Sequence, residues 1–153
     1  MPGNPRSTLA IAGHPLHPML VPLPLGLLVG AFVSDLACWR SGWGGFADFS
    51  TWLIGGGLAT ALLAAVAGLT DLVSEPRIRA LSKAWWHMAA MVLAVMLSIA
   101  NFAIRLHDGA AALPAGLALS AMVAVLLAFG GWMGGEMVFR HRVGVREPGA
   151  REP

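Results

Sequence analysis

The sequence predicts an all-α fold, a transmembrane four-helix bundle with both termini in the cytoplasm. The 153 residues are 57% hydrophobic and only 12% charged, and the mean hydropathy of +0.71 lies outside the range of soluble globular domains. The apolar residues form four blocks, each near or above the roughly 20 residues that a helix needs to cross a bilayer. These blocks predict helices at about residues 19–39, 52–73, 84–105 and 113–139.

The basic residues predict the orientation. Four crossings place the N-terminal segment, the loop 74–83 and the C-terminal tail on one side, which then carries eight of the ten Lys and Arg residues. Short basic segments remain cytoplasmic, so we expect both termini inside and a multi-pass location in the bacterial cytoplasmic (inner) membrane. Topology and anionic lipid account for the net charge of +2, so the expected partner is the lipid bilayer and not a nucleic acid.

Three segments are expected along the chain. Residues 1–18 form a cytoplasmic N-terminal segment with an HPLHP motif, residues 19–141 form the transmembrane domain, and residues 142–153 form a disordered cytoplasmic tail because Arg, Glu, Pro and Gly dominate it. The first apolar block is expected to stay in the mature protein, since it starts late and lacks a small-residue cleavage site. Cys38 is the only cysteine, which excludes intrachain disulfides and cysteine-ligated iron-sulfur clusters.

The first helix follows two His-Pro steps. His14 and His17 each precede a proline, and a residue in that position is disfavoured in the helical region. We therefore expect both histidines to be extended and the helix to begin no earlier than Pro18. Pro22 and Pro24 fall in its first turns, where a missing amide costs least.

The second and fourth helices are rich in small residues at spacings of three and four, a pattern typical of close helix packing. The second ends with Asp71 and Glu75, and the fourth carries two Gly-Gly pairs before Glu136 and His141. The glycine-rich face of the fourth helix also leaves room for a flat cofactor such as a porphyrin. A histidine opens helices one and three and a carboxylate closes helices two and four, which weakly indicates an internal hairpin repeat.

The third helix carries a polar stripe at alternating steps of four and three. Polar groups in a membrane helix avoid lipid, so we expect this stripe to face the bundle. Asp35 is expected to pair with Arg40 or Arg105, and Glu136 with Arg140 one turn on. The stripe consists of His87, Met91, Ala94, Ser98, Asn101 and Arg105.

The predicted topology gathers most histidines at the cytoplasmic rim. Imidazole is the commonest ligand for haem iron, copper and zinc, so the candidate cofactor-binding residues are His14, His17, His87 and His141. Asp71 and Glu136 are candidate metal ligands or hydrogen-bond partners of the ligands. The opposite rim has only His107, so at most one bis-histidine haem fits, with His87 and either His17 or His141 as its ligands. Alternatively, these histidines are interfacial residues without a ligand.

Several motifs point to one family. They are the run from Gly13 to Pro22, Gly68-Leu69-Thr70-Asp71, His87 with Asn101, and the run from Gly130 to Glu136 leading to His141, Gly144 and Val145. Together they resemble the bacterial membrane family named domain of unknown function 2231. The resemblance implies a four-helix membrane protein without an established activity. Similar modules occur joined to Rieske-type iron-sulfur domains, which favours a redox membrane. The motif residues include all six candidates at the rim.

Three functions remain open from the sequence. The leading hypothesis is a redox or electron-transfer module that binds haem b or a transition metal at the cytoplasmic rim and is not an enzyme on its own. Its partner would be a second copy of the chain or a separate redox protein. The second hypothesis is a non-enzymatic accessory or structural membrane subunit, and the third is a small-solute transporter that uses the polar stripe with Asp35.

Overall fold

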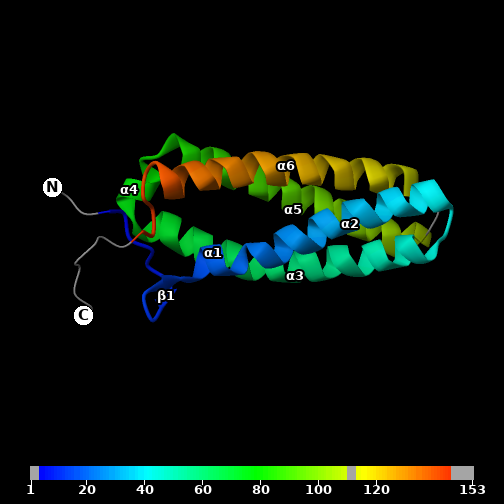
Figure 1. Ribbon diagram of the computed structural model, residues 1–153, viewed down its shortest axis with the longest axis horizontal. Coiled ribbons are helices and arrows are strands. Elements are labelled where there is room, and N and C mark those ends of the chain that lie inside the picture. Colours follow the sequence, from blue (N-terminus) through cyan, green and yellow to red (C-terminus); the bar gives the residue numbers. More distant parts are fainter. Residues whose placement is uncertain (1–3, 110–112, 146–153) are drawn as a thin grey trace.

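Four long helices lie side by side along the long axis of the molecule (Figure 1). The structure is a computed structural model that describes residues 4–109 and 113–145, and it confirms the predicted all-α bundle. The helices are long and apolar enough to cross a membrane. They are α2 (Pro22–Ser41), α3 (Gly45–Ser74), α5 (Ser82–Asp108) and α6 (Leu113–Phe139), with the short helices α1 (Leu16–Leu20) before α2 and α4 (Pro76–Arg79) between α3 and α5.

The N-terminal segment forms a small antiparallel hairpin of β1 (Ala10–Ile11) and β2 (His14–Pro15) before it enters α1. His14 is extended in β2, as expected. The expected helix start was wrong, because α1 begins at Leu16 and His17 is helical. The Leu16 amide donates to the Leu9 carbonyl at 2.9 Å, and Pro18 falls in the first turn, where no intrahelical amide donor is needed.

The second long helix also begins earlier than the apolar block indicates. α3 starts at Gly45, since this segment already packs on α2: Ser34 Oγ donates to the Phe46 carbonyl at 2.7 Å and Ser50 Oγ donates to the Ala31 carbonyl at 3.2 Å. Between them the chain turns at Gly42, whose φ of 70° is the left-handed conformation that glycine adopts without strain.

The bundle consists of two similar hairpins, α2–α3 and α5–α6. Residues of α2 and α5 that lie 70 positions apart are both buried. These pairs are Pro24 and Ala94, Leu28 and Ser98, Ala31 and Asn101, and Asp35 and Arg105. Positions 66 residues apart in α3 and α6 correspond in the same way, namely Ser50 with Gly116, Ile54 with Ser120, Gly57 with Val123, Ala64 with Gly130 and Ala67 with Met133. The matched burial supports the internal repeat.

Two equivalent pairs meet where the hairpins face each other. Asp35 contacts Arg105, and the ring of His17 contacts the ring of His87, also 70 positions later. A pair of equivalent residues can touch only near the axis that relates them. A pseudo-two-fold axis therefore runs along the bundle and passes both contacts.

The first and last described residues lie at the same end of the bundle, here named the terminal end; the opposite end is the loop end. Asn4 Nδ2 donates to the Val145 carbonyl at 3.0 Å, and the Gly144 amide donates to the Pro5 carbonyl at 2.9 Å. Val143 packs on the buried cluster of Leu72, Ile78 and Ala84. Residues 142–145 thus fold back onto the bundle, unlike the expected disordered tail; the remainder of that tail lies outside the described residues.

Candidate functional site

His17 of α1 and His87 of α5 form a pair inside the terminal half of the bundle. Their ring centroids are 6.1 Å apart and their planes are perpendicular. Both side chains are half-buried. The pair joins the two hairpins, because each histidine belongs to a different one.

Each imidazole is held by a backbone carbonyl of its own hairpin. His17 Nδ1 lies 2.8 Å from the Ala64 carbonyl oxygen, and His87 Nδ1 lies 2.7 Å from the Gly130 carbonyl oxygen. A carbonyl oxygen only accepts, so both Nδ1 atoms carry the proton and, in the neutral ring, both Nε2 atoms keep a lone pair. Histidines that bind metals are oriented in this way, with the second ring nitrogen donating to a backbone carbonyl or a carboxylate.

Glycines allow the two rings to approach the neighbouring helices. A Cβ at Gly68 would lie 2.8 Å from Cε1 and Nδ1 of His17, and a Cβ at Gly134 would lie 3.4 Å from Nδ1 of His87. These glycines occupy equivalent positions of the repeat, 66 residues apart. The close helix packing predicted from the small residues therefore positions the histidine pair.

The other candidate histidines do not reach this pair. His14 is exposed in β2, where its Nδ1 lies 3.0 Å from the Ala12 carbonyl. His141 is exposed in the turn after α6. Of the four predicted ligands the structure brings together only His17 and His87, and within the described residues it contains no group of three or more His, Cys, Asp or Glu that could hold a metal ion.

The candidate carboxylates have other partners. Asp71 holds the N-terminal segment, since its Oδ1 accepts from the Thr8 amide at 2.7 Å and the Leu9 amide at 3.3 Å, and its Oδ2 accepts from Ser7 Oγ at 2.8 Å. Glu136 pairs with Arg140 at 3.2 Å, as expected. Asp71 fixes the chain that leads into α1 and so contributes to the position of His17.

Comparison with known proteins identifies the family. A family model described as "Predicted membrane protein (DUF2231)" matches residues 13–147. The chain belongs to this family. The searches of curated proteins and of solved structures each gave no match.

This DUF2231 protein has a second polar site at the loop end. Arg105 donates from Nη2 to Asp35 Oδ2 at 2.7 Å and from Nε to Asn101 Oδ1 at 2.8 Å. Ser120 Oγ donates to the same Asp35 oxygen at 2.6 Å and accepts from Asn101 Nδ2 at 2.9 Å. The sequence left Arg40 or Arg105 as the partner of Asp35, and the structure selects Arg105; the inward-facing stripe is as predicted. The sequence did not single out Ser120, whose only signal is a lone hydroxyl in an apolar helix.

An apolar layer separates the two polar sites of this DUF2231 protein. His87 and Arg105 are 18 positions apart in α5, or about 27 Å along a helix that rises 1.5 Å per residue. Between them lies the buried cluster of Leu28, Ala94, Val123 and Leu127. The buried hydroxyl of Ser98 also lies between the two sites, but it donates to the Ala94 carbonyl of its own helix at 2.8 Å.

Proposed function

We propose that the protein binds a metal centre between His17 and His87, with haem b as the favoured group, and serves electron transfer. The observation that carries this proposal is the paired imidazoles on the pseudo-two-fold axis, both with Nδ1 donating to a backbone carbonyl. Their free ligand atoms are the two Nε2 atoms. Neutral imidazole is a common ligand for haem iron, copper and zinc.

The spacing of the rings fits a shared ion. With metal–nitrogen bonds of about 2 Å, two imidazoles on opposite sides of one ion have ring centres roughly 6 Å apart. The centroids of His17 and His87 are separated by 6.1 Å. The distance between the ring centres thus matches the one that a shared ion would require.

The number of ligands favours haem over a bare ion. His17 and His87 would hold a haem iron through two imidazole nitrogens, because the porphyrin supplies the other ligands, whereas a bare transition-metal ion in its usual tetrahedral protein site would need four protein ligands. The described residues offer two imidazoles and no third His, Cys or carboxylate ligand beside them. Gly134 of α6 lies in close contact with the His87 ring, where a Cβ would be 3.4 Å from Nδ1, so it holds the imidazole against the helix.

Two axial histidines also favour electron transfer over catalysis. If both histidines held the iron, the protein would leave no ligand position for oxygen or a substrate. The apolar layer beneath the pair keeps its surroundings dry, a factor that tunes redox potentials. We therefore propose an electron carrier without catalysis of its own, which exchanges electrons with a separate redox protein or within a homo-oligomer.

The proposed orientation has both termini in the cytoplasm of a bacterial cell, which puts the histidine pair in the cytoplasmic half of the inner membrane. It is supported by the bias of Lys and Arg toward the terminal end. Reporter fusions after Arg146 and after Asp108 test it. An extracytoplasmic signal from the first fusion would contradict the orientation without touching the histidine pair.

Visible absorption spectra test the metal centre directly. Protein purified in mild detergent from haem-supplemented cells is expected to have a Soret band that sharpens on dithionite reduction. His17→Ala and His87→Ala are expected to abolish it, while His14→Ala and His141→Ala keep it. Elemental analysis of the same samples detects a bare ion. A colourless, metal-free wild-type protein would contradict the proposal and favour an accessory subunit in which the histidines only join the helices.

A further inference from the structure

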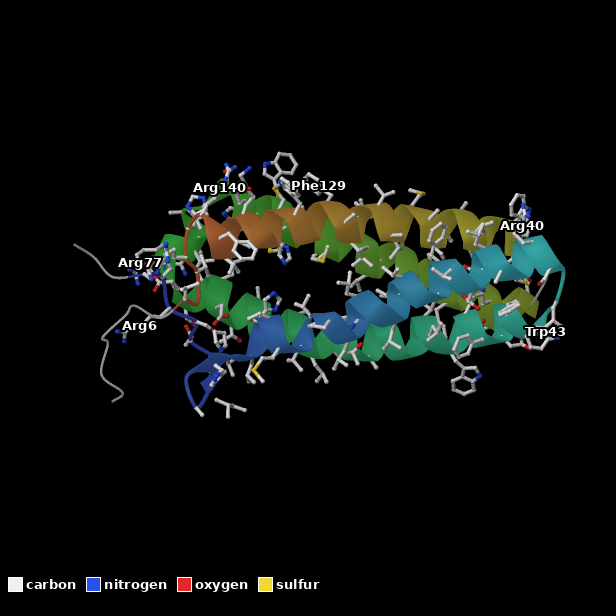
Figure 2. All side chains as sticks on the ribbon, viewed as in Figure 1. Arg6, Arg40, Trp43, Arg77, Phe129 and Arg140 are labelled. Carbon is white, nitrogen blue, oxygen red and sulfur yellow. The ribbon has the colours of Figure 1, made fainter. Side chains whose placement is uncertain are left out.

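The terminal end carries positive charge that the protein itself does not neutralise. All three described carboxylates there are engaged: Asp71 by the N-terminal segment, Glu75 by Arg77 and Glu136 by Arg140. Figure 2 places the labelled Arg6, Arg77 and Arg140 at this end, and Arg40 at the opposite one. The described cations without a carboxylate partner at the terminal end are Arg6, Arg79, Lys83 and Arg142.

Three of these cations are direct chain neighbours of residues in one packed apolar cluster. Ile78 of α4, Ala84 of α5 and Val143 of the C-terminal turn pack together. Their direct chain neighbours are Arg79, Lys83 and Arg142, respectively. The contact between α4, α5 and the turn after α6 thus brings the backbones of three cationic residues near one another. The Arg79 guanidinium also donates to the Val73 carbonyl at the end of α3.

Two tryptophans mark the depth of this cationic cluster in a membrane. Trp85 Nε1 donates to the Arg79 carbonyl at 2.9 Å, and the rings of Trp85 and Trp86 are 49% and 61% exposed. Exposed tryptophans of membrane helices lie at the level of the lipid headgroups. The three cations therefore lie at headgroup level.

We infer that Arg79, Lys83 and Arg142 bind the phosphate of an acidic phospholipid. Juxtamembrane cations attract anionic lipid headgroups, and among the described residues no carboxylate forms an ion pair with these three cations. The loop end has no such excess of positive charge among its described residues. Its exposed charged side chains are one cation, Arg40, and two carboxylates, Asp48 and Asp108. The inference does not rest on the proposed metal centre, because it is argued from the charges and positions of Arg79, Lys83 and Arg142 alone.

Native mass spectrometry of the full chain tests the site. The protein is released from vesicles of phosphatidylcholine mixed with phosphatidylglycerol, and the retained lipids are counted. Wild type is expected to retain phosphatidylglycerol preferentially. At about 1 kcal/mol per basic residue, each lost cation lowers this preference about five-fold, and the double variant Lys83→Gln/Arg142→Gln lowers it roughly 25-fold. Arg40→Gln, which removes an exposed cation at the loop end, is expected to behave as wild type.

Three outcomes would overturn the assignment: equal retention of both lipids by wild type, an unchanged preference in the double variant, or displacement of phosphatidylglycerol by millimolar inorganic phosphate. The last would identify free phosphate as the ligand. Circular dichroism confirms that the double variant is folded. The single variant Lys83→Gln provides the same test if the double variant aggregates, since the Lys83 side chain makes no ion pair with a described carboxylate.

Discussion

Asp35 and Arg105 form an ion pair of 2.7 Å although each lies within a helix that can cross a bilayer. Their side chains are 0% and 2% exposed, and they occupy equivalent positions of the two hairpins. Ser120 and Asn101 provide additional hydrogen bonds. Buried charges are costly unless they are paired and hydrogen-bonded, so each partner of this pair requires the other.

Removing the cation is expected to destabilise the bundle strongly. Arg105→Gln leaves the Asp35 carboxylate buried without a counter-charge, which costs about 3–5 kcal/mol. Equilibrium unfolding in mixed micelles measures the change in the free energy of unfolding. Arg40→Gln, on an exposed residue near the same end, is expected to change it by less than about 0.5 kcal/mol. A loss below 1 kcal/mol in Arg105→Gln would argue against the importance of the pair.

Exchanging the two charges is expected to restore part of this loss. In Asp35→Arg/Arg105→Asp the ion pair forms with its polarity reversed, since the two positions are related by the pseudo-two-fold axis. The coupling between contacting charges amounts to about 0.5–3 kcal/mol in such cycles. The double variant should therefore be more stable than the sum of its single variants indicates. Strict additivity of the two single effects would refute a direct pairing.

An alanine at Gly68 is expected to displace His17. The added Cβ would lie 2.8 Å from the ring, so the imidazole must rotate away from the Ala64 carbonyl; such overpacking costs about 1–3 kcal/mol. Gly131→Ala is the matched control, because nothing lies within 4 Å of that position. Thermal unfolding and, in haem-supplemented preparations, the Soret absorbance measure the effect. Similar behaviour of the two variants would mean that the ring is not fixed by this contact.

Asp71→Ala is expected to release the N-terminal segment. The carboxylate accepts from two backbone amides and one hydroxyl, and hydrogen bonds to charged groups contribute about 1.5–3 kcal/mol each. Hydrogen exchange at Thr8 and Leu9 should accelerate at least about tenfold. Thr70→Ala is a suitable control, since the Thr70 hydroxyl bonds only the Val66 carbonyl of its own helix. Unchanged exchange in Asp71→Ala would show that other contacts hold the segment.

Glu75 provides a prediction on pH. The hydrogen bond from the Arg77 side chain, aided by the Arg77 amide, lowers the pKa of Glu75 from 4.5 to about 2. A lowered pKa in the folded state means that this contact stabilises the fold above the unfolded pKa of about 4.3 and that its contribution is lost as the pH falls toward 2. Carboxyl NMR of Glu75 should titrate near 2 in wild type and markedly higher in Arg77→Gln. A midpoint that does not move would exclude Arg77 as the cause.

The sequence predicted the four helices well because their signal is compositional. Apolar blocks separated by short loops define a bundle without any knowledge of its packing. The pairing of Asp35 with Arg105 was predictable as one of two alternatives, since parallel helices place both charges at one depth; the sequence alone did not exclude Arg40. The start of α1 was not, because it depends on the hydrogen bond from Leu16 to Leu9, a contact made by the β-hairpin.

The candidate site was predicted only in part. The sequence places His14, His17, His87 and His141 at one end, but it does not specify which of them meet. His17 and His87 occupy equivalent positions of the two halves and meet where these halves face each other. The repeat becomes clear only when the burial of residues 70 positions apart in α2 and α5, and 66 positions apart in α3 and α6, is compared. Asp71 resembled a metal ligand in the sequence, but its partners are backbone amides. A residue pattern does not reveal such partners.

The reversed charges at positions 35 and 105 also determine which hairpins can associate. Two copies of α2–α3 would place carboxylate against carboxylate, and two copies of α5–α6 would place guanidinium against guanidinium. Only the combination of one α2–α3 hairpin with one α5–α6 hairpin places a carboxylate against a guanidinium. The two hairpins therefore relate to each other like two different subunits joined in one polypeptide. Halves produced separately from a gene split in the loop between α3 and α5 are expected to associate with each other rather than with themselves.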